Sequence, residues 1–280
     1  MQPVRELEIG VMFWAGRDPA ETIRELKDAG ARCGQLGVPG DFALDAAATA
    51  AWKKAIEAEA FPLVTVFAAY TGESYADIPT VQRTVGFIPA AMRAQREKRT
   101  LEISDFAAAL GVSAIALHVG FVPEDQSDPD YVAVREMVRR VADQAVSHGQ
   151  VFALETGQEP APVLLRFIED VARPNIRINF DPANMVLYGS GDPIEALGLL
   201  GSYVVSVHCK DGDWPPKEKP GALGTERPLG RGSVGIPRFI AKLREVGYKG
   251  ALCIEREVED REERMRDVRA AAAMLERLRA

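Results

Sequence analysis

The chain has 280 residues, of which 47% are hydrophobic, and its formal net charge is −7 at pH 7. A chain of this length buries a large core, so it needs no disulfide framework or structural metal for stability. The acidic balance argues against nucleic acid as a partner, because binding a phosphate backbone requires clustered Lys and Arg. It favours a small-molecule substrate instead.

The cysteines and the chain start point to a cytoplasmic protein. Cys33, Cys209 and Cys253 form no C-x-x-C pair, which predicts free thiols in a reducing compartment. The first residues include acidic side chains and no long apolar run, so we predict no secretory signal. No apolar stretch reaches membrane-spanning length, so we predict no membrane partner.

Short apolar runs rich in β-branched residues alternate with amphipathic stretches that end in glycine, which predicts eight strands alternating with helices. The predicted strands are Leu7–Trp14, Cys33–Val38, Leu63–Ala68, Ala114–Val119, Val151–Glu155, Ile176–Asp181, Val204–His208 and Ala251–Glu255. Three helices are expected to begin with a capping Asp before Pro at the first helical position. These pairs are Asp18-Pro19, Asp128-Pro129 and Asp192-Pro193. The last helix is predicted over Asp260–Leu278.

Eight successive βα units predict a closed (β/α)₈ TIM barrel, formed as a single domain by residues 1–280. An open doubly wound sheet is the alternative, but no G-x-G-x-x-G follows the first strand. Two connections are unusually long, from Tyr70 to about Pro89 and from Asp211 to about Ser233. Both follow strands, so we expect them over the C-terminal mouth of the barrel as lids or binding loops.

Ionisable side chains stand at the ends of the last four predicted strands. They are Glu155 in FALET, Asp181 in INFDPAN, His208 in VSVHCKD and Glu255 in LCIERE. Adjacent strands lie about 4.8 Å apart, so these residues can meet at one point above the barrel core. Three carboxylates repel one another unless a cation lies between them. Carboxylate oxygens with one imidazole suit Mn²⁺, Mg²⁺ or Co²⁺, with Zn²⁺ also open, and we predict one divalent ion, preferably Mn²⁺.

Each of these four residues has a simpler interpretation when taken alone. A single strand-end carboxylate is more often a helix cap or a salt-bridge partner, and Asp181 before Pro182 could cap the next helix. A single strand-end histidine is more often a satisfied core residue. The four together, at the same end of successive strands, favour a metal site over four separate structural roles.

Several motifs give the chain a resemblance to a known family. They are the Glu155 strand, D-P-A-N at Asp181–Asn184, H-x-K-D at His208–Asp211, L-G-x-G-x-V at Leu229–Val234, and Glu255. With them the chain resembles the sugar phosphate isomerase/epimerase family of xylose isomerase-like TIM barrels over essentially its whole length. In that family the positions matching Glu155, Asp181, His208 and Glu255 bind the metal. In its epimerases the carboxylates matching Glu155 and Glu255 also form the acid/base pair.

The resemblance implies a metal-dependent isomerase, either a sugar epimerase or an aldose–ketose isomerase, acting on a sugar or sugar phosphate. The metal would stabilise an enediolate while one carboxylate removes the proton α to a carbonyl and the other returns a proton. Dimers and tetramers are common in that family, so a homo-oligomer of either size is compatible with the resemblance and the oligomeric state stays open. Three alternatives stay open: a keto-inositol dehydratase on the same metal site, a non-catalytic sugar-binding protein, and phosphodiester cleavage as in endonuclease IV, which needs more histidine ligands.

Six further residues are candidates for binding the substrate: Trp14, Phe67, His118, Asn184, Lys210 and Arg227. His118 could hydrogen-bond a hydroxyl or the carbonyl, and Lys210 could neutralise a phosphate or an enediolate. Trp14 and Phe67 could form an apolar wall under the CH face of a sugar. Two candidates depart from the family pattern. Asn184 stands where many family epimerases have His, and Arg227 follows a longer insertion than the family's arginine before the Gly-rich turn.

Overall fold

Eight parallel strands close into a barrel in the computed structural model, which describes residues 4–16 and 18–280. The barrel strands are β1 (Ile9–Trp14), β2 (Cys33–Val38), β3 (Leu63–Ala68), β4 (Ala114–Leu117), β5 (Val151–Glu155), β6 (Ile176–Phe180), β7 (Val204–Cys209) and β10 (Leu252–Ile254). They follow chain order around the barrel, and β1 pairs with both β2 and β10 to close it. The predicted (β/α)₈ TIM barrel is confirmed.

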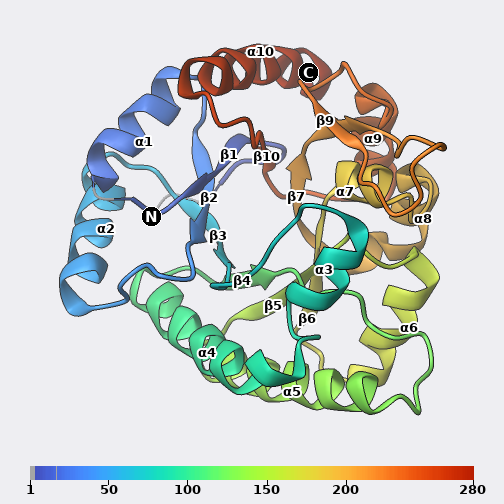
Figure 1. The fold of residues 1–280 in the computed structure, drawn as a ribbon. Helices are drawn as coiled ribbons and strands as arrows, with labels where there is room; N and C mark the ends of the chain where they lie inside the picture. The colour runs from blue at the N-terminus through green and yellow to red at the C-terminus, as the bar shows by residue number, and fades with distance from the viewer. Residues whose placement is uncertain (1–3, 17) are drawn as a thin grey trace.

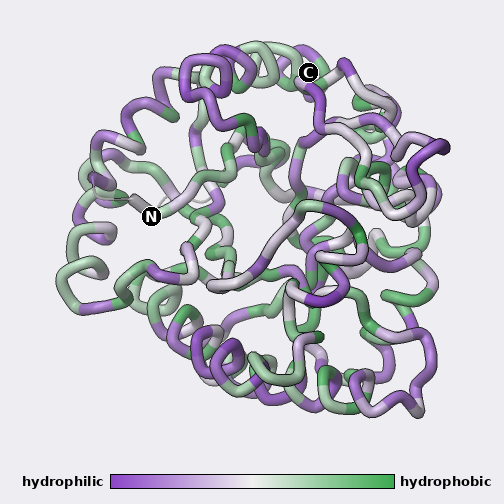
Figure 2. Tube along the Cα trace, in the orientation of Figure 1, coloured by the Kyte–Doolittle hydropathy of each residue, from purple (hydrophilic) through white to green (hydrophobic). Residues whose placement is uncertain are grey.

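Helices encircle the strands (Figure 1). They are α1 (Pro19–Asp28), α2 (Ala46–Ala58), α3 (Ile78–Thr84), α4 (Arg93–Ala109), α5 (Pro129–Ser147), α6 (Ala161–Val171), α7 (Pro182–Tyr188), α8 (Pro193–Leu200), α9 (Ile236–Glu245) and α10 (Arg261–Arg279), with 3₁₀ turns η1 (Ala90–Met92) and η2 (Gly201–Tyr203). Hydrophilic and hydrophobic residues alternate along the surrounding helices, as Figure 2 shows. In α1, Pro19, Ile23 and Leu26 are buried, which is the spacing of one helix face packed on the barrel.

The helix starts follow the capping chemistry of the sequence. The side chains of Asp18, Asp128 and Asp192 accept hydrogen bonds from backbone amides in the first turns of α1, α5 and α8. Asp260 does the same for α10, which therefore begins one residue after the predicted start. Among the described residues, no helix combines the length and the apolar character needed to cross a membrane.

Several strand ends differ from the prediction by one or two residues. The first strand begins at Ile9 and not at Leu7, because Leu7 has a φ of 52°, in the left-handed region that interrupts a strand. The predicted strand Ala114–Val119 ends at Leu117, and the predicted strand Ala251–Glu255 shortens to β10. Asp181 lies just beyond β6 and caps α7, so it is a loop residue at the strand end.

The two long connections, residues 69–89 and 210–235, are called here the mouth loops. The first contains α3, and the second contains a small antiparallel hairpin of β8 (Asp211–Asp213) and β9 (Thr225–Arg227). The backbone N–H of Ile78 donates to the carbonyl of Gly221 at 2.9 Å, so the two mouth loops touch. Both line a cavity at the C-terminal ends of the strands, which confirms their predicted place over the barrel mouth.

Asp211 fastens the second mouth loop at its base. Its buried carboxylate accepts backbone hydrogen bonds of 2.9–3.1 Å from the amides of Gly212, Gly230, Gly232 and Val234. A Cβ at Gly232 would collide with the Asp211 carboxylate and with the backbone of Gly212. This contact explains why the H-x-K-D and L-G-x-G-x-V motifs occur together in one chain.

We predict that Asp211→Ala lowers the free energy of unfolding by about 3 kcal/mol, because four backbone amides, two of them buried, lose a charged acceptor. Urea unfolding followed by circular dichroism measures the change. Asp213→Ala is the matched control on the same hairpin. It removes two exposed contacts, the ion pair with Arg227 and a hydrogen bond from Ser233 Oγ at 3.2 Å, which together contribute about 1 kcal/mol. Equal losses in the two variants would contradict the anchoring role of Asp211.

Candidate functional site

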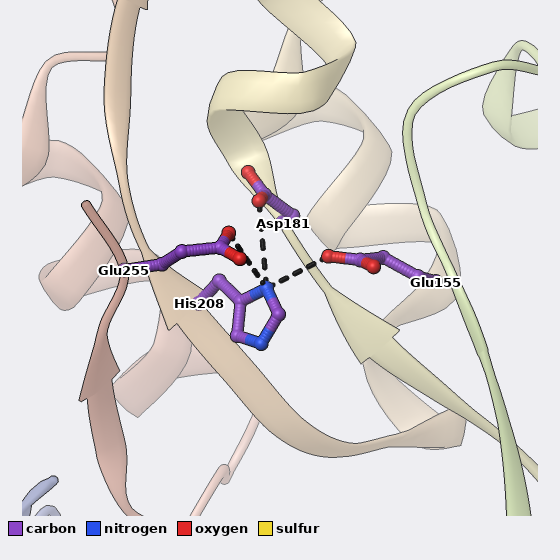
Figure 3. A group of neighbouring side chains, drawn as sticks. All are labelled: Glu155, Asp181, His208 and Glu255. Carbon is purple, nitrogen blue, oxygen red and sulfur yellow. Dashed lines mark ion pairs between the residues drawn. The ribbon is translucent and has the colours of Figure 1, made fainter. Parts of the chain in front are cut away.

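Glu155, Asp181, His208 and Glu255 meet above the C-terminal ends of four neighbouring strands, and Figure 3 shows their side chains pointing toward one another. One ligand atom from each residue lies within 4.8 Å of the others. Atoms on opposite sides of an ion bound at about 2.1 Å lie about 4.2 Å apart. The cluster is therefore of a size that could hold one metal ion.

The three carboxylates converge on one ring nitrogen. His208 Nδ1 lies 2.7 Å from Glu155 Oε1, 3.1 Å from Glu255 Oε2 and 3.5 Å from Asp181 Oδ2. The side chains of Glu155, Asp181 and His208 are at most 1% exposed, and that of Glu255 is 10% exposed. Three carboxylates taken out of water at such short separations need a positive charge among them.

The donor atoms of this cluster fit a divalent cation. Asp181 Oδ2 and Glu255 Oε2 are buried and have ion-pair contacts with His208 or Lys210, but no group of the described residues donates a hydrogen bond of good geometry to them. The other oxygen of Asp181, Oδ1, accepts the backbone N–H of Asn184 at 2.9 Å and caps α7. Asp181 is thus a helix cap through one oxygen and a member of the cluster through the other. Three carboxylates and one imidazole are a donor set that Mn²⁺ and Mg²⁺ accept.

Neighbouring cations keep two of the carboxylates ionised. Burial alone would raise the pKa of Glu155, but His118 and His208 lower it to about 2. Burial also opposes ionisation of Glu255, but His208 and Lys210 hold its pKa well below the usual range. Burial raises the pKa of Asp181 to about 6. The two glutamates therefore carry full negative charge at neutral pH.

A series of hydrogen-bonded polar side chains inside the barrel orients the His208 ring. Gln35 Oε1 accepts a hydrogen bond from His208 Nε2 at 2.5 Å, and Gln35 Nε2 donates to Asn179 Oδ1 at 3.2 Å. Ser206 Oγ donates to the same Asn179 oxygen at 2.6 Å. Because Nε2 is occupied by Gln35, Nδ1 is the nitrogen that faces the carboxylates. Gln35, Asn179 and Ser206 were not predicted as part of the site. Their only mark in the sequence is that each is a polar residue within an otherwise mostly apolar strand.

A cavity of about 270 Å³, called here the metal-side cavity, lies against the cluster. Five of the six predicted substrate-binding residues line it: Trp14, Phe67, His118, Asn184 and Lys210. Several lining residues were not predicted, among them Tyr75 and Glu226 from the mouth loops, Tyr188 from α7, and Glu257 after β10. The mouth loops were recognisable in the sequence, but which of their side chains face inward was not.

Arg227 does not line this cavity, and its role in binding the substrate stays a prediction. It is exposed on β9, and its Nε donates to Asp213 Oδ2 at 2.7 Å. Successive side chains in a strand point to opposite faces, so the preceding residue, Glu226, faces the cavity in its place.

Each glutamate of the cluster has its own cationic partner. His118 Nε2 lies 2.9 Å from Glu155 Oε2. Burial would lower the pKa of His118, but Glu155 outweighs this and raises it to about 9. Lys210 Nζ lies 3.2 Å from Glu255 Oε2 and 2.5 Å from Glu257 Oε2, and its side chain is only 4% exposed. Lys210 is therefore already neutralised by two carboxylates.

Two more predicted residues pack closely around these groups. Asn184 Nδ2 lies 3.4 Å from Glu155 Oε1, within reach of a weak hydrogen bond. The ring of Phe67 lies 5.5 Å from the His118 ring and 5.8 Å from the His208 ring, centroid to centroid. Phe67 is thus an apolar wall against both histidines, whereas Trp14 is 44% exposed at the end of β1.

Comparison with known proteins identifies the family of this chain. The family model described as xylose isomerase-like TIM barrel matches residues 23–278, so the chain belongs to that family. The crystal structure of a xylose isomerase domain protein from Planctomyces limnophilus is 42% identical in sequence. It has a TM-score of 0.93 and covers 98% of each chain.

More distant matches share the fold. A D-psicose 3-epimerase structure determined with D-fructose has a TM-score of 0.69 at 18% identity, covering 97% of this chain and 99% of its own. A xylose isomerase-like protein from Mycobacterium smegmatis, in complex with magnesium, has a TM-score of 0.71 at 17% identity, covering 98% and 96%. The uncharacterized protein MJ1311 of Methanocaldococcus jannaschii is 26% identical over 183 residues, which is 60% of each chain.

A further carboxylate, Glu159, is buried without an ion pair to any of the described residues. Its Oε1 accepts the backbone N–H of Val122 at 2.8 Å, and its Oε2 has no hydrogen-bond partner in the same part of the chain. Burial raises its pKa from 4.5 to about 7. Between these two values the unfolded chain loses a proton that the folded protein keeps, so stability falls as pH rises through this window.

We predict that Glu159→Gln removes this loss of stability, because Gln keeps the acceptor for Val122 and cannot ionise. At about pH 8 the variant gains ~2 kcal/mol in free energy of unfolding, and at about pH 4 it gains almost nothing. Urea unfolding across this pH range measures both values. An equal difference at the two pH values would show that Glu159 does not titrate as described.

Proposed function

We propose that this protein is a divalent-metal-dependent sugar isomerase, acting as an epimerase or an aldose–ketose isomerase. One observation carries the proposal. Glu155 and Glu255 approach the same point from opposite sides, as Figure 3 shows, and both are ionised at neutral pH. Two carboxylates on opposite faces are what removal and return of a proton at one sugar carbon require.

Glu155, Asp181, His208 and Glu255 are the proposed ligands, with Mn²⁺ preferred and Mg²⁺, Co²⁺ and Zn²⁺ open. When bound, a divalent ion stabilises negative charge that develops on a substrate oxygen. Membership of the xylose isomerase-like family supports this assignment, as does the shared fold with a D-psicose 3-epimerase and with a magnesium complex. Whether the chain forms a dimer or a tetramer stays open.

The surrounding side chains would orient the two proton carriers. His118 and Asn184 contact the two oxygens of Glu155, which holds that carboxylate toward the cavity. Lys210 holds Glu255 in the same way from the other side. Phe67 and Trp14 supply apolar surface for the CH face of a sugar ring. Each carboxylate in turn accepts a proton from carbon or returns one to it.

The test is solvent deuterium exchange into ketoses, monitored by NMR, with metal content measured on the same protein. We expect about one divalent ion per chain, exchange at a single carbon, and loss of exchange with EDTA. Glu155→Gln and Glu255→Gln each lower the turnover by about 10²–10⁴-fold in protein that still folds. Glu262→Gln, an exposed change on α10, is the control.

The outcomes separate the proposal from its rivals. Release of water from a keto-inositol, with loss of a hydroxyl group, would assign a dehydratase that uses the same residues. Sugar binding that survives both Gln substitutions, without exchange, would assign a non-catalytic binding protein. Full activity in metal-free protein would refute the metal-dependent mechanism.

We also predict that Gln35 tunes the affinity of the cluster for metal through His208. Gln35→Met removes the acceptor for His208 Nε2 at nearly constant side-chain volume, so the ring loses its orientation. The Kd for Mn²⁺ then rises by about 10–100-fold, measured by isothermal titration calorimetry. Gln35→Glu keeps an acceptor and retains most of the affinity. Unchanged affinity in Gln35→Met would refute this positioning role.

A further inference from the structure

A second and larger cavity opens beside the metal-side cavity. It has a volume of about 750 Å³ and lies between the end of β1, α1, the segment after β10, and α10. We call it the vestibule. It shares Met12, Trp14, Glu255 and Glu257 with the metal-side cavity, so the two spaces meet at these four residues.

The other side of the metal-side cavity is covered by the mouth loops. The Ile78–Gly221 hydrogen bond joins the loops to each other, and the backbone N–H of Gly224 donates to the carbonyl of Leu187 at 2.8 Å. Leu187 and Gly224 both line the metal-side cavity. The vestibule therefore borders the metal-side cavity at Trp14, away from the contacts that join the mouth loops.

The sizes of the two cavities suit a ligand in two parts. Sites for small molecules typically measure about 300–1,000 Å³. The metal-side cavity, at about 270 Å³, falls just below this range and suits a single sugar ring. The vestibule, at about 750 Å³, lies well inside the range and offers room for a second ring.

The charges of the vestibule disfavour a phosphate or a carboxylate. Among the residues that the structure describes, six carboxylates and three arginines line it. Arg256 is paired with Glu226 at 3.0 Å and with Asp267 at 2.9 Å, and Arg261 is paired with Glu25. Three of the six carboxylates are paired as well, Glu25 with Arg261, and Glu255 and Glu257 with Lys210. Three carboxylates and one guanidinium group therefore stay unpaired among the described residues, and an anionic ligand would meet a net negative wall.

Trp14 and Arg264 supply the groups that a neutral, hydroxyl-rich ring requires. Trp14 is 44% exposed and lines both cavities, so its ring offers an apolar face at their junction. Arg264 is half-buried in the vestibule wall, and no carboxylate lies within 4.0 Å of it in the described part of the chain. Its donors are free for hydroxyl groups, and the surrounding carboxylates are acceptors.

We propose that the vestibule is a second sugar subsite, and that the substrate is a ketose carrying another uncharged sugar ring. The ketose unit, in its open-chain form with a free carbonyl, lies at Glu155 and Glu255, and the second sugar ring lies over Trp14 toward Arg264. This inference rests on the proposed function. It narrows the substrate from sugars and sugar phosphates to uncharged glycosides or disaccharides that keep a free carbonyl.

The test uses the full-length Mn²⁺-loaded protein and four probes: D-fructose, its 6-phosphate, and fructose carrying a galactosyl group at O4 or a glucosyl group at O6. Deuterium exchange and Kd are measured for each probe. We expect at least one disaccharide to exceed fructose and its phosphate by about tenfold in affinity and in kcat/KM. Arg264→Ala and Thr22→Trp, which fills the vestibule from α1, reduce that advantage at least about fivefold.

Arg266→Ala is the matched control, because Arg266 lies on the same helix, is exposed, and does not line the vestibule. Exchange on fructose with no preference for either disaccharide would overturn the subsite and leave the proposed function standing. A preference for the 6-phosphate would overturn it in the same way. Tighter disaccharide binding that depends on Arg264, without any exchange, would support the subsite and reject the isomerase reaction. Neither binding nor exchange would reject both.

Discussion

The repulsion among three buried carboxylates is the constraint on which the rest of this site depends. Glu155, Asp181 and Glu255 are placed together because neighbouring parallel strands end at the same edge of the barrel. Such a group is stable only if positive charge lies within it and beside it. His208 occupies the centre, while His118 and Lys210 stand at the flanks. The strands of the barrel hold these charged side chains in fixed positions relative to one another.

The barrel interior and the barrel mouth contribute in different ways to the balance between the carboxylates and the cationic side chains. Gln35 reaches His208 across the barrel interior, so the orientation of one ring is determined by strands on opposite walls. At the mouth, Asp211 fixes the loop that brings Glu226 to the cavity and turns Arg227 outward. The charge that the loop places at the cavity therefore depends on the register of β9, because a shift of one residue would replace the Glu226 carboxylate with the Arg227 guanidinium group.

The barrel and the four-residue cluster could be predicted from the sequence, because both leave strong local signals in it. A strand-end carboxylate after an apolar run is conspicuous, and so is an Asp-Pro helix start. The residues that were not predicted leave only weak signals in the sequence. Gln35 and Asn179 are single polar residues in buried strands, and a sequence does not show which residues face each other across a closed barrel. The outward position of Arg227 was not predictable, because β8 and β9 are too short to show the alternation that reveals a strand.

Asp181 links the cluster to the wall of the barrel through a single carboxylate. Its Oδ1 caps α7 at the Asn184 amide, and its Oδ2 lies among the other carboxylates. Electron density drawn toward Oδ2 leaves less at Oδ1, so the first turn of α7 experiences any change of charge within the cluster. The Asn184 amide is thus a natural spectroscopic reporter. Its proton resonance should follow the state of the cluster without any label on the substrate.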